Sequence, residues 1–254
     1  MLTGLFATLF YLATAILVVG VTRRVVGYWQ TPAPLKIPTM PAPRTQGGMV
    51  YRMAREVVLF ESLFKANKWI WIFGWVFHMA LLLVVMRHFR YFQESAWFWV
   101  NIVQPFGKYA GFAMIFGLGG LLARRFVVER IRYISTPSDY LMLVLLLGIG
   151  VSGMMMTMVF HTDIIAVKEF MLGVMVFDFS HEMPADPLVI IHFSLVILLM
   201  IIFPISKLMH APGIFFSPTR NQIDDSREKR HVAPWAGELD AASLRAESQQ
   251  SGEK

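Results

Sequence analysis

The stretch of sequence that decides the fold is WIWIFGWVFHMALLLVVMRH, residues 69–88, which places His78 and His88 within a long apolar run. A helix needs about 20 predominantly apolar residues to cross roughly 30 Å of hydrocarbon, and this run has that length. Tryptophan gathers at the membrane–water interface, and three tryptophans stand near the start of the run. Arg87 and Arg90 mark its other end. The stretch therefore predicts a transmembrane helix that carries ionisable side chains.

The whole chain has the composition of an integral membrane protein. Of its 254 residues, 56% are hydrophobic and 16% are charged, whereas about a quarter are charged in a typical soluble domain. The formal net charge is +6; because basic residues gather at the ends of apolar segments, we interpret it as a topology signal and not as nucleic-acid binding. The chain has no cysteine, which excludes an iron–sulfur cluster, a thioether-attached haem, a Cys-ligated zinc ion and a disulfide. Any redox centre must therefore be held by His or Met.

Five apolar stretches predict an all-α membrane protein, a bundle of five transmembrane helices. The expected spans cover residues 2–22, 69–88, 108–123, 139–160 and 188–209. The third is short and rich in glycine, which suits close approach between helices. The first resembles a secretory signal, but its basic pair, Arg23 and Arg24, follows the apolar run instead of preceding it. We therefore expect this segment to remain in the mature protein.

The charges of the loops predict the orientation of the bundle. The loop over residues 23–68 holds eight basic residues against two acidic ones, and residues 124–132 add four arginines. Residues 161–187 hold five acidic residues and one basic residue. By the positive-inside rule, the N-terminus lies outside and the C-terminus in the cytoplasm. This organisation predicts a multi-pass protein of the cytoplasmic (inner) membrane.

Several segments are expected to lie off the membrane. Residues 30–45 contain five prolines and predict an extended linker. Residues 49–65 carry an apolar stripe with helical spacing, which predicts a surface helix on the cytoplasmic side. The outer-loop stretch 164–179 is apolar but interrupted by charge, which favours an interfacial or partner-packing helix. Residues 211–254 form a cytoplasmic extension, whose tail over 236–254 we expect to be disordered.

Four of the seven histidines lie in two of the predicted spans. His78 and His88 are ten residues apart, which places them about 15 Å apart along a helix, and His192 and His210 are eighteen residues apart, or about 27 Å. The two spans run antiparallel, so His78 lies toward the inner side with His210, and His88 lies toward the outer side with His192. Each pair can bind the iron of one haem b from two sides through neutral imidazoles, which predicts two haems. Tilt of the helices and a kink at Pro204 must absorb the unequal spacings.

Other interpretations of these residues stay open. A single histidine near a helix end can lie at the polar interface, and a single ionisable residue in a span can be a satisfied hydrogen-bonding group. The arginines near the span ends either pair with haem propionates or anchor the helices at the interface; they are Arg87, Arg90, Arg124 and Arg125. We assign no ligand role to the loop and tail histidines, His161, His181 and His231.

The histidine spacing and the segment FPISKLMH, residues 203–210, resemble the gamma-subunit family of respiratory nitrate reductase over roughly residues 1–210. That resemblance implies a five-helix, di-haem cytochrome b that exchanges electrons with membrane quinone, menaquinone or ubiquinone. Such a chain is an electron-transfer subunit of an oxidoreductase and not a stand-alone enzyme. The resemblance implies the same histidine pairs as haem ligands, and it makes Lys108 a quinone contact near the outer haem. Arg87 stands where the family has a small residue, which puts the detailed quinone geometry in doubt.

Within this family, the segments HAPGIFFSPTRN (residues 210–221) and RHVAPW (residues 230–235) and the proline-rich first loop resemble the DsrM subfamily, membrane subunits associated with dissimilatory sulfite reductase. This likeness implies a DsrK-like iron–sulfur partner on the cytoplasmic side, related to heterodisulfide reductase. Further Dsr subunits, DsrJ, DsrO and DsrP, are implied with it, as is a role in dissimilatory sulfur metabolism. The alternative is a gamma subunit of a nitrate reductase or of a heterodisulfide-reductase-like complex.

Two functions of another class also fit a small membrane bundle. A proton-relay transporter would use histidines within its spans together with carboxylates. The five apolar stretches contain no carboxylate, since the apolar part of the fourth begins at about Tyr140, after Asp139. A cofactor-free anchor for a larger assembly explains the helices but not the pattern of histidines. The sequence shows neither a nucleotide-binding glycine loop nor a serine-nucleophile motif, so nucleotide-dependent enzymes and serine hydrolases have no support.

Overall fold

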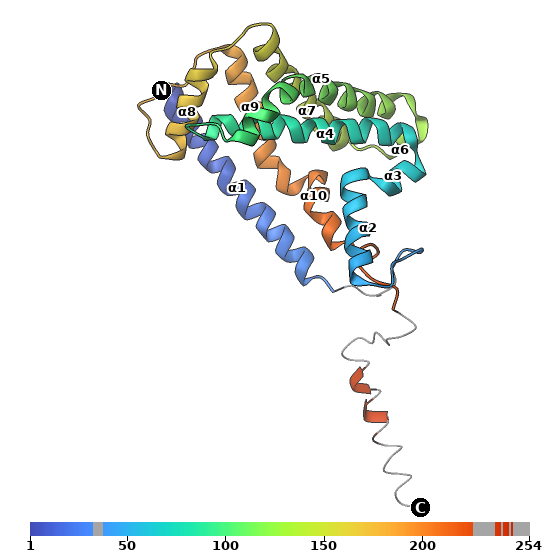
Figure 1. Ribbon diagram of the computed structural model, residues 1–254. Coiled ribbons are helices and arrows are strands. Elements are labelled where there is room, and N and C mark those ends of the chain that lie inside the picture. The colour runs from blue at the N-terminus through green and yellow to red at the C-terminus, as the bar shows by residue number, and fades with distance from the viewer. Residues whose placement is uncertain (33–37, 226–236, 240, 244, 246–254) are drawn as a thin grey trace, which may run out of the picture.

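The structure is a computed structural model, which describes residues 1–32, 38–225, 237–239, 241–243 and 245 (Figure 1). Most of the tail expected to be disordered, residues 236–254, lies outside the described residues, as do His231 and the rest of the segment 230–235. The prediction made for that tail therefore stays a prediction.

The part of the chain that the structure describes contains helices and no strand. Five helical segments are long and apolar enough to cross a membrane, which confirms the five-span prediction. They are built on α1 (Leu2–Gln30), α4 (Lys68–His88), α5 (Phe98–Val127), α7 (Pro137–Met158) and α9 (Pro187–Ile202), with 3₁₀ turns over Phe89–Phe92 after α4 and Phe203–Ile205 after α9.

The third span is longer than expected. Helix α5 covers 30 residues and continues through Pro105, whereas the apolar pattern predicted a short span over residues 108–123. Asn101 and Gln104 interrupt the apolar run before Lys108, and hydropathy alone does not show a helix that extends beyond the hydrocarbon. The first helix likewise continues past Arg23 and Arg24.

The fifth span is shorter than expected, because the chain breaks at Pro204. The expected continuous helix over residues 188–209 ends at Ile202. It is followed by two 3₁₀ turns, Phe203–Ile205 and Lys207–Met209, with Ser206 extended between them. Proline cannot donate to the carbonyl four residues earlier, and its ring crowds that carbonyl, so the regular helix ends here. The helix that carries His192 therefore ends before His210, close to the proline where a kink was expected, and the spacing of about 27 Å, which assumed one unbroken helix, does not apply.

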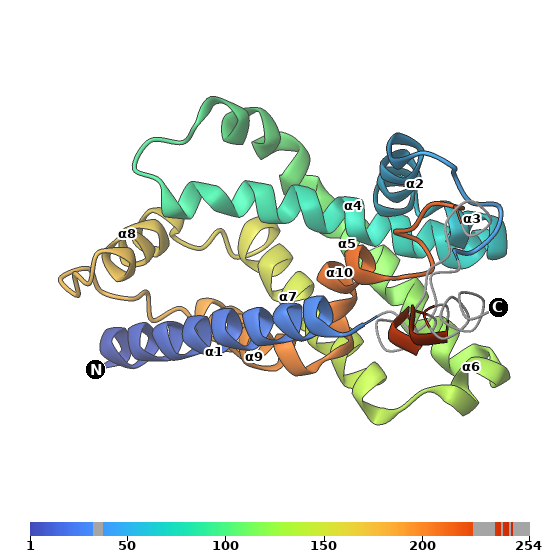
Figure 2. The same ribbon diagram turned by 90° about the horizontal axis from the view of Figure 1, so that it is seen from below.

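The spans form an arc in which each helix packs on the next. Helix α4 packs on α5, α5 on α7, α7 on α9, and α9 on α1. Figure 2 shows α1 and α9 together on one side and α4 on the other. The two histidine-bearing segments are therefore held opposite each other by α5 and α7.

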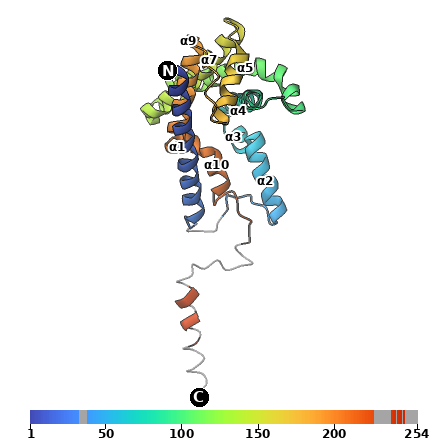
Figure 3. The ribbon, with the colours of Figure 1, turned by 90° about the vertical axis from the view of Figure 1, so that its left-hand side faces the viewer.

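Short helices cover the ends of the spans. Helical structure over the expected residues 49–65 is confirmed, but in two helices and not one. These are α2 (Gln46–Leu59) and α3 (Glu61–Ala66), which meet at Phe60 in the left-handed conformation. The outer-loop helix is confirmed as α8 (Ile164–Met175). The remaining short helices are α6 (Glu129–Ile134) and α10 (His210–Gly213). In Figure 3, as in Figure 1, α2 and α10 lie on the same side of the molecule as the end of α1.

Glycines bring α5 close to α4, as the glycine-rich pattern predicted. A Cβ atom on Gly117 would lie 2.8 Å from the carbonyl oxygen of Phe73 and 2.9 Å from Cβ of Phe77. On Gly120 it would lie within 2.6 Å of three ring atoms of Phe73. Because His78 follows Phe77, this packing also sets the position of the first histidine.

We expect Gly117→Ala to lower the free energy of unfolding by about 1–3 kcal/mol, since the added methyl group must displace backbone of α4. Gly119→Ala is the matched control on the same helix, because a Cβ there meets nothing within 4 Å. Denaturant titration of both variants in detergent, followed by circular dichroism, measures the difference. Equal stabilities of the two variants would refute the close-packing argument.

Candidate functional site

The four membrane histidines meet in the two predicted couples. The ring centres of His78 and His210 lie 5.9 Å apart with their planes at 83°. Those of His88 and His192 lie 6.4 Å apart with their planes at 12°. One member of each couple comes from α4, and the other comes from α9 or from the start of α10. The fold thus brings together imidazoles that are more than a hundred residues apart in the chain.

Three of the four rings are anchored through Nδ1 to a nearby backbone carbonyl. His78 donates to Gly74 O at 2.7 Å, and His88 donates to Val84 O at 2.6 Å. His210 donates to Lys207 O at 2.9 Å. A carbonyl oxygen only accepts hydrogen bonds, so Nδ1 carries the proton in each of these rings. Each ring therefore presents the lone pair of Nε2 to its surroundings.

The fourth ring, His192, is anchored to a side chain. Its Nδ1 donates to Ser152 Oγ of α7 at 2.9 Å, and the Ser152 hydroxyl in turn donates to Ile149 O at 3.1 Å. Both residues are buried, with 8% of His192 and 5% of Ser152 exposed. Gly153 leaves room for this ring, because a Cβ there would lie 3.3 Å from His192 Cε1.

The geometry of both couples fits an iron atom held between two imidazoles. With bonds of about 2 Å from metal to imidazole nitrogen and about 1.1 Å from that nitrogen to the ring centre, two imidazoles on opposite sides of one metal ion have ring centres about 6 Å apart. Within the described residues no hydrogen bond engages Nε2 of these four histidines, and no group of three or more His, Cys, Asp or Glu side chains is arranged to hold a bare metal ion. Two axial ligands per couple are what a haem needs, because the macrocycle brings its own four nitrogens.

Aromatic side chains line the first couple. The rings of Phe60 and Phe77 lie 4.9 and 4.7 Å from that of His78, both edge-on. Phe60 was read from the sequence only as one position of an apolar helical stripe. Its role beside His78 depends on the left-handed turn between α2 and α3, which the apolar pattern does not reveal. At the other couple, the ring of Tyr91 lies 5.8 Å from that of His88.

The arginines near the span ends have protein partners of their own. Arg87 Nε and Arg90 donate to the same oxygen of Gln104, at 3.2 and 3.1 Å. Arg125 donates to Ser135 Oγ at 2.8 Å and lies 3.6 Å from the Asp139 carboxylate. These contacts give Arg87, Arg90 and Arg125 structural roles that the sequence interpretation had not specified.

Lys108 lies half-buried on α5. Its ammonium is 6.0 Å from the ring centre of Tyr109. Within the described part of the chain, Lys108 and His88 share no hydrogen bond or ring contact. Its expected quinone contact therefore stays a prediction.

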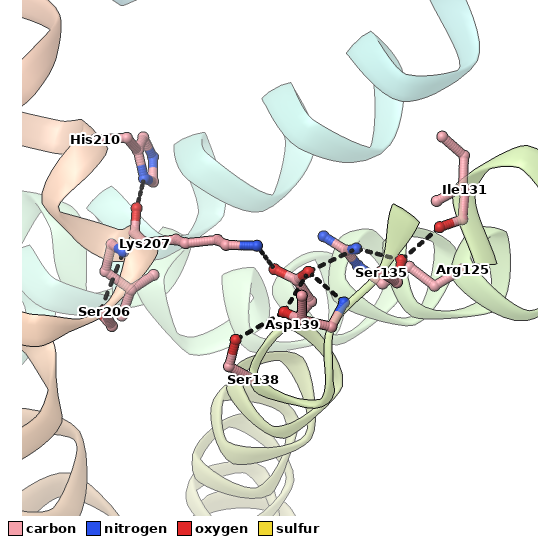
Figure 4. A network of polar contacts seen from close by, with 10 residues as sticks. Arg125, Ile131, Ser135, Ser138, Asp139, Ser206, Lys207 and His210 are labelled. Carbon is pink, nitrogen blue, oxygen red and sulfur yellow. Dashed lines mark hydrogen bonds and ion pairs between the residues drawn. The ribbon is translucent and has the colours of Figure 1, made fainter. Parts of the chain in front are cut away.

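A network of polar contacts lies beside the His78 and His210 couple (Figure 4). Lys207 donates from Nζ to Asp139 Oδ1 at 2.7 Å, and Arg125 approaches the other carboxylate oxygen. Asp139 is 7% exposed and belongs to the first turn of α7. The sequence analysis assigned no site role to Asp139 or to Lys207.

Comparison with known proteins assigns the chain to a family. A family model described as nitrate reductase gamma subunit matches residues 47–224, which include all four histidines. The Hdr-like menaquinol oxidoreductase cytochrome b-like subunit of Archaeoglobus fulgidus is 35% identical over 269 aligned positions, which cover 89% of this chain and 81% of the relative. The subunit of the same description from Archaeoglobus profundus is 33% identical and covers 91% and 82%. On this match and these identities, the chain belongs to the nitrate reductase gamma subunit family.

Proposed function

We propose that this chain is the haem b subunit of a membrane-bound menaquinol oxidoreductase complex and that it carries electrons between menaquinol and a partner subunit. One observation carries the proposal: two couples of imidazoles, with ring centres 5.9 and 6.4 Å apart, whose Nδ1 atoms are occupied and whose Nε2 atoms are available. The names of the two archaeal relatives, each a cytochrome b-like subunit of a menaquinol oxidoreductase, support it.

In this proposal, His78 with His210 and His88 with His192 hold one haem b each. Haem b, when bound, supplies reversible one-electron transfer at its iron. Helix α4 fixes the spacing, because ten residues of helix separate His78 from His88 by about 15 Å along the axis. The hydrogen bonds to Nδ1 keep each imidazole neutral and hold its orientation, which is the usual role of such outer partners of metal ligands.

The proposed orientation places the N-terminus and α8 outside and the C-terminus in the cytoplasm, in the cytoplasmic membrane. The acidic loop 161–187 and the basic loop 23–68 support it through the positive-inside rule. In that orientation the couple of His88 and His192 is the outer one. Lys108, twenty residues after His88, is our candidate for a group that donates a hydrogen bond to a quinone carbonyl.

The chain needs a partner to pass electrons on, because it has no cysteine to hold an iron–sulfur cluster. We propose a DsrK-like iron–sulfur subunit at the cytoplasmic face, in contact with the basic loop 23–68 and the segment after His210. We base the wider assembly with DsrJ, DsrO and DsrP, and the role in sulfur metabolism, on the resemblance of the segments at 210–221 and 230–235 and of the proline-rich first loop. The description Hdr-like in the names of the relatives supports a heterodisulfide-reductase-type partner over a nitrate reductase.

The rival functions gain no support from the site. Among the described residues the one buried carboxylate is Asp139, and it is paired with Lys207 and Arg125. A proton relay needs a carboxylate that can release and regain its proton, which a cation on each side opposes. A cofactor-free anchor leaves the two facing couples without a purpose.

We expect the purified protein to show the low-spin visible spectrum of two bis-histidine haems, reduced by a menaquinol analogue. His88→Ala and His210→Ala should each remove one of the two haems, because each takes one ligand from a different couple. Pyridine haemochrome assay and visible spectra of the two variants measure this. His161→Ala, in the outer loop, is the control and should keep both haems.

A colourless wild-type protein would overturn the proposed function. Two haems retained in both His88→Ala and His210→Ala would overturn the ligand assignment. Loss of both haems in each single variant, with the helical content unchanged, would mean that the four histidines form one site and not two.

We expect Ser152→Ala to weaken binding of the haem at the His88 and His192 couple roughly 10-fold and to leave the other haem unchanged. The physical reason is that the buried Nδ1–H of His192 loses its acceptor, so the ring loses its fixed orientation. Ser152→Thr keeps the hydroxyl and should restore binding. Thr157→Ala removes a hydroxyl from the same helix that bonds only to Gly153 O, and should change neither haem. Haem retention during detergent washing, followed by potentiometric titration, separates the outcomes.

A further inference from the structure

One histidine of the inner couple, His210, lies outside the long spans, at the start of the four-residue helix α10. His210 follows the break at Pro204 and the 3₁₀ turn Lys207–Met209. His78, His88 and His192, in contrast, lie within α4 and α9, where the helical hydrogen-bond ladder sets the direction of each side chain. The position of the His210 ring must therefore come from contacts made by the turn itself.

Side-chain packing, local hydrogen bonds and one long-range ion pair hold this turn. Leu208 packs against the core cluster that contains Phe77, and Met209 is buried. Leu208 N donates to Ser206 Oγ at 3.2 Å, and Met209 N donates to Ser206 O at 3.4 Å. Both bonds stay within four residues and do not fix the turn relative to the bundle. The ion pair from Lys207 to Asp139, at 2.7 Å, joins the turn to α7 across 68 positions of sequence.

Lys207 connects the ion pair to the ligand. Its carbonyl oxygen accepts the hydrogen bond from His210 Nδ1 at 2.9 Å, while its ammonium is bound to Asp139. Figure 4 shows the side chain of Lys207 reaching from the turn to Asp139, with His210 above the Lys207 backbone. The ion pair at the Lys207 ammonium therefore restrains the Lys207 backbone carbonyl, and this carbonyl orients the His210 imidazole.

Asp139 is a rigid anchor for this purpose. Its Oδ2 accepts from the backbone N and the hydroxyl of Thr136, both at 3.0 Å, as the capping box of α7. Arg125 near the end of α5 approaches the same oxygen at 3.6 Å. The carboxylate, whose side chain is 6% exposed, is thus fixed by two spans before Lys207 binds it. Because a buried carboxylate is costly without a nearby cation, Asp139 holds the ammonium of Lys207 at its Oδ1 atom.

We propose that Asp139 is a positioning residue for the inner haem ligand and acts on His210 through Lys207. The inference rests on the proposed function, since it assigns the ion pair a role at one of the two haem sites. It extends that function to residues that lie outside the histidine couples. The ion pair sets how firmly Nε2 of His210 faces Nε2 of His78, and it has no contact with the outer couple.

Lys207→Met tests the proposal, because it removes the ammonium and leaves Asp139 with Arg125 and the α7 cap. We expect roughly 10-fold weaker retention of the inner haem, together with carbon monoxide binding to that haem after reduction, as its sixth ligand becomes exchangeable. The outer haem should keep its midpoint potential. Lys207→Arg restores a cation and should restore the wild-type spectrum. Asp139→Asn should give the same inner-haem change as Lys207→Met, with the amide oxygen still able to accept from Thr136.

Lys168→Met is the matched control. Lys168 also joins two distant segments, since its Nζ donates to Glu94 O at 2.7 Å, but it lies on α8 near the opposite end of the spans. It should leave the inner haem unchanged. Repeating Lys207→Met in a His192→Ala background, in which the inner haem is the one retained, assigns the signal to a single site.

The outcomes separate this inference from the proposed function. Wild-type protein without haem overturns the proposed function, and the inference with it. Two haems in the wild type, with Lys207→Met unchanged in retention, potential and carbon monoxide binding, overturns the inference alone. Equal changes at both haems would also overturn it, because they would report a general loss of structure.

Discussion

The structure depends on the hydrogen bond that each membrane histidine makes through Nδ1. An imidazole inside a span is costly unless its polar atoms have partners. In α4 the partner is available from the helix itself, since the carbonyls of Gly74 and Val84 lie four residues before His78 and His88. A carbonyl has two lone pairs and can serve the helix and the side chain together. The Nδ1 atom of each ring thereby has its partner within the protein, and Nε2 remains available to another group between the helices.

The two sides of the site are built differently. Helix α4 carries one histidine of each couple, so its rigidity sets the distance between the two couples. The opposite side is assembled from several elements: His192 on α9 relies on Ser152 of α7, and His210 relies on a turn that is tied to the start of α7. Helix α7 thus carries none of the four histidines, but its residues Ser152 and Asp139 help to hold His192 and the turn before His210. This explains how α4 and α9 can face each other although their main packing partners are α5, α7 and α1.

The sequence was sufficient for the spans and the histidine couples because both signals are local or follow from topology. A run such as residues 69–88 is apolar enough to be recognised alone, and two antiparallel spans that each carry two histidines at different depths pair them in one way. The contact between Ser152 and His192 joins residues 40 positions apart, and the contact between Lys207 and Asp139 joins residues 68 positions apart. No rule of sequence spacing predicts either contact. The extent of α5 was missed because Asn101, Gln104 and Pro105 break the apolar pattern while the helix continues.

Pro204 shows why the break in the last span is needed. Ten residues separate the histidines on α4, and eighteen separate His192 from His210; an unbroken helix would leave about 12 Å of mismatch between the two sides. Ending α9 at Ile202 redirects the chain and lets His210 reach His78. Irregular backbone at membrane depth is tolerated only where protein surrounds it. Here α1 provides that cover: a Cβ on Gly20 would lie 2.6 Å from Cβ of Pro204. The first span therefore has a physical role at the site although it supplies no ligand, because a larger residue than glycine at position 20 would push α1 away from the turn that leads to His210.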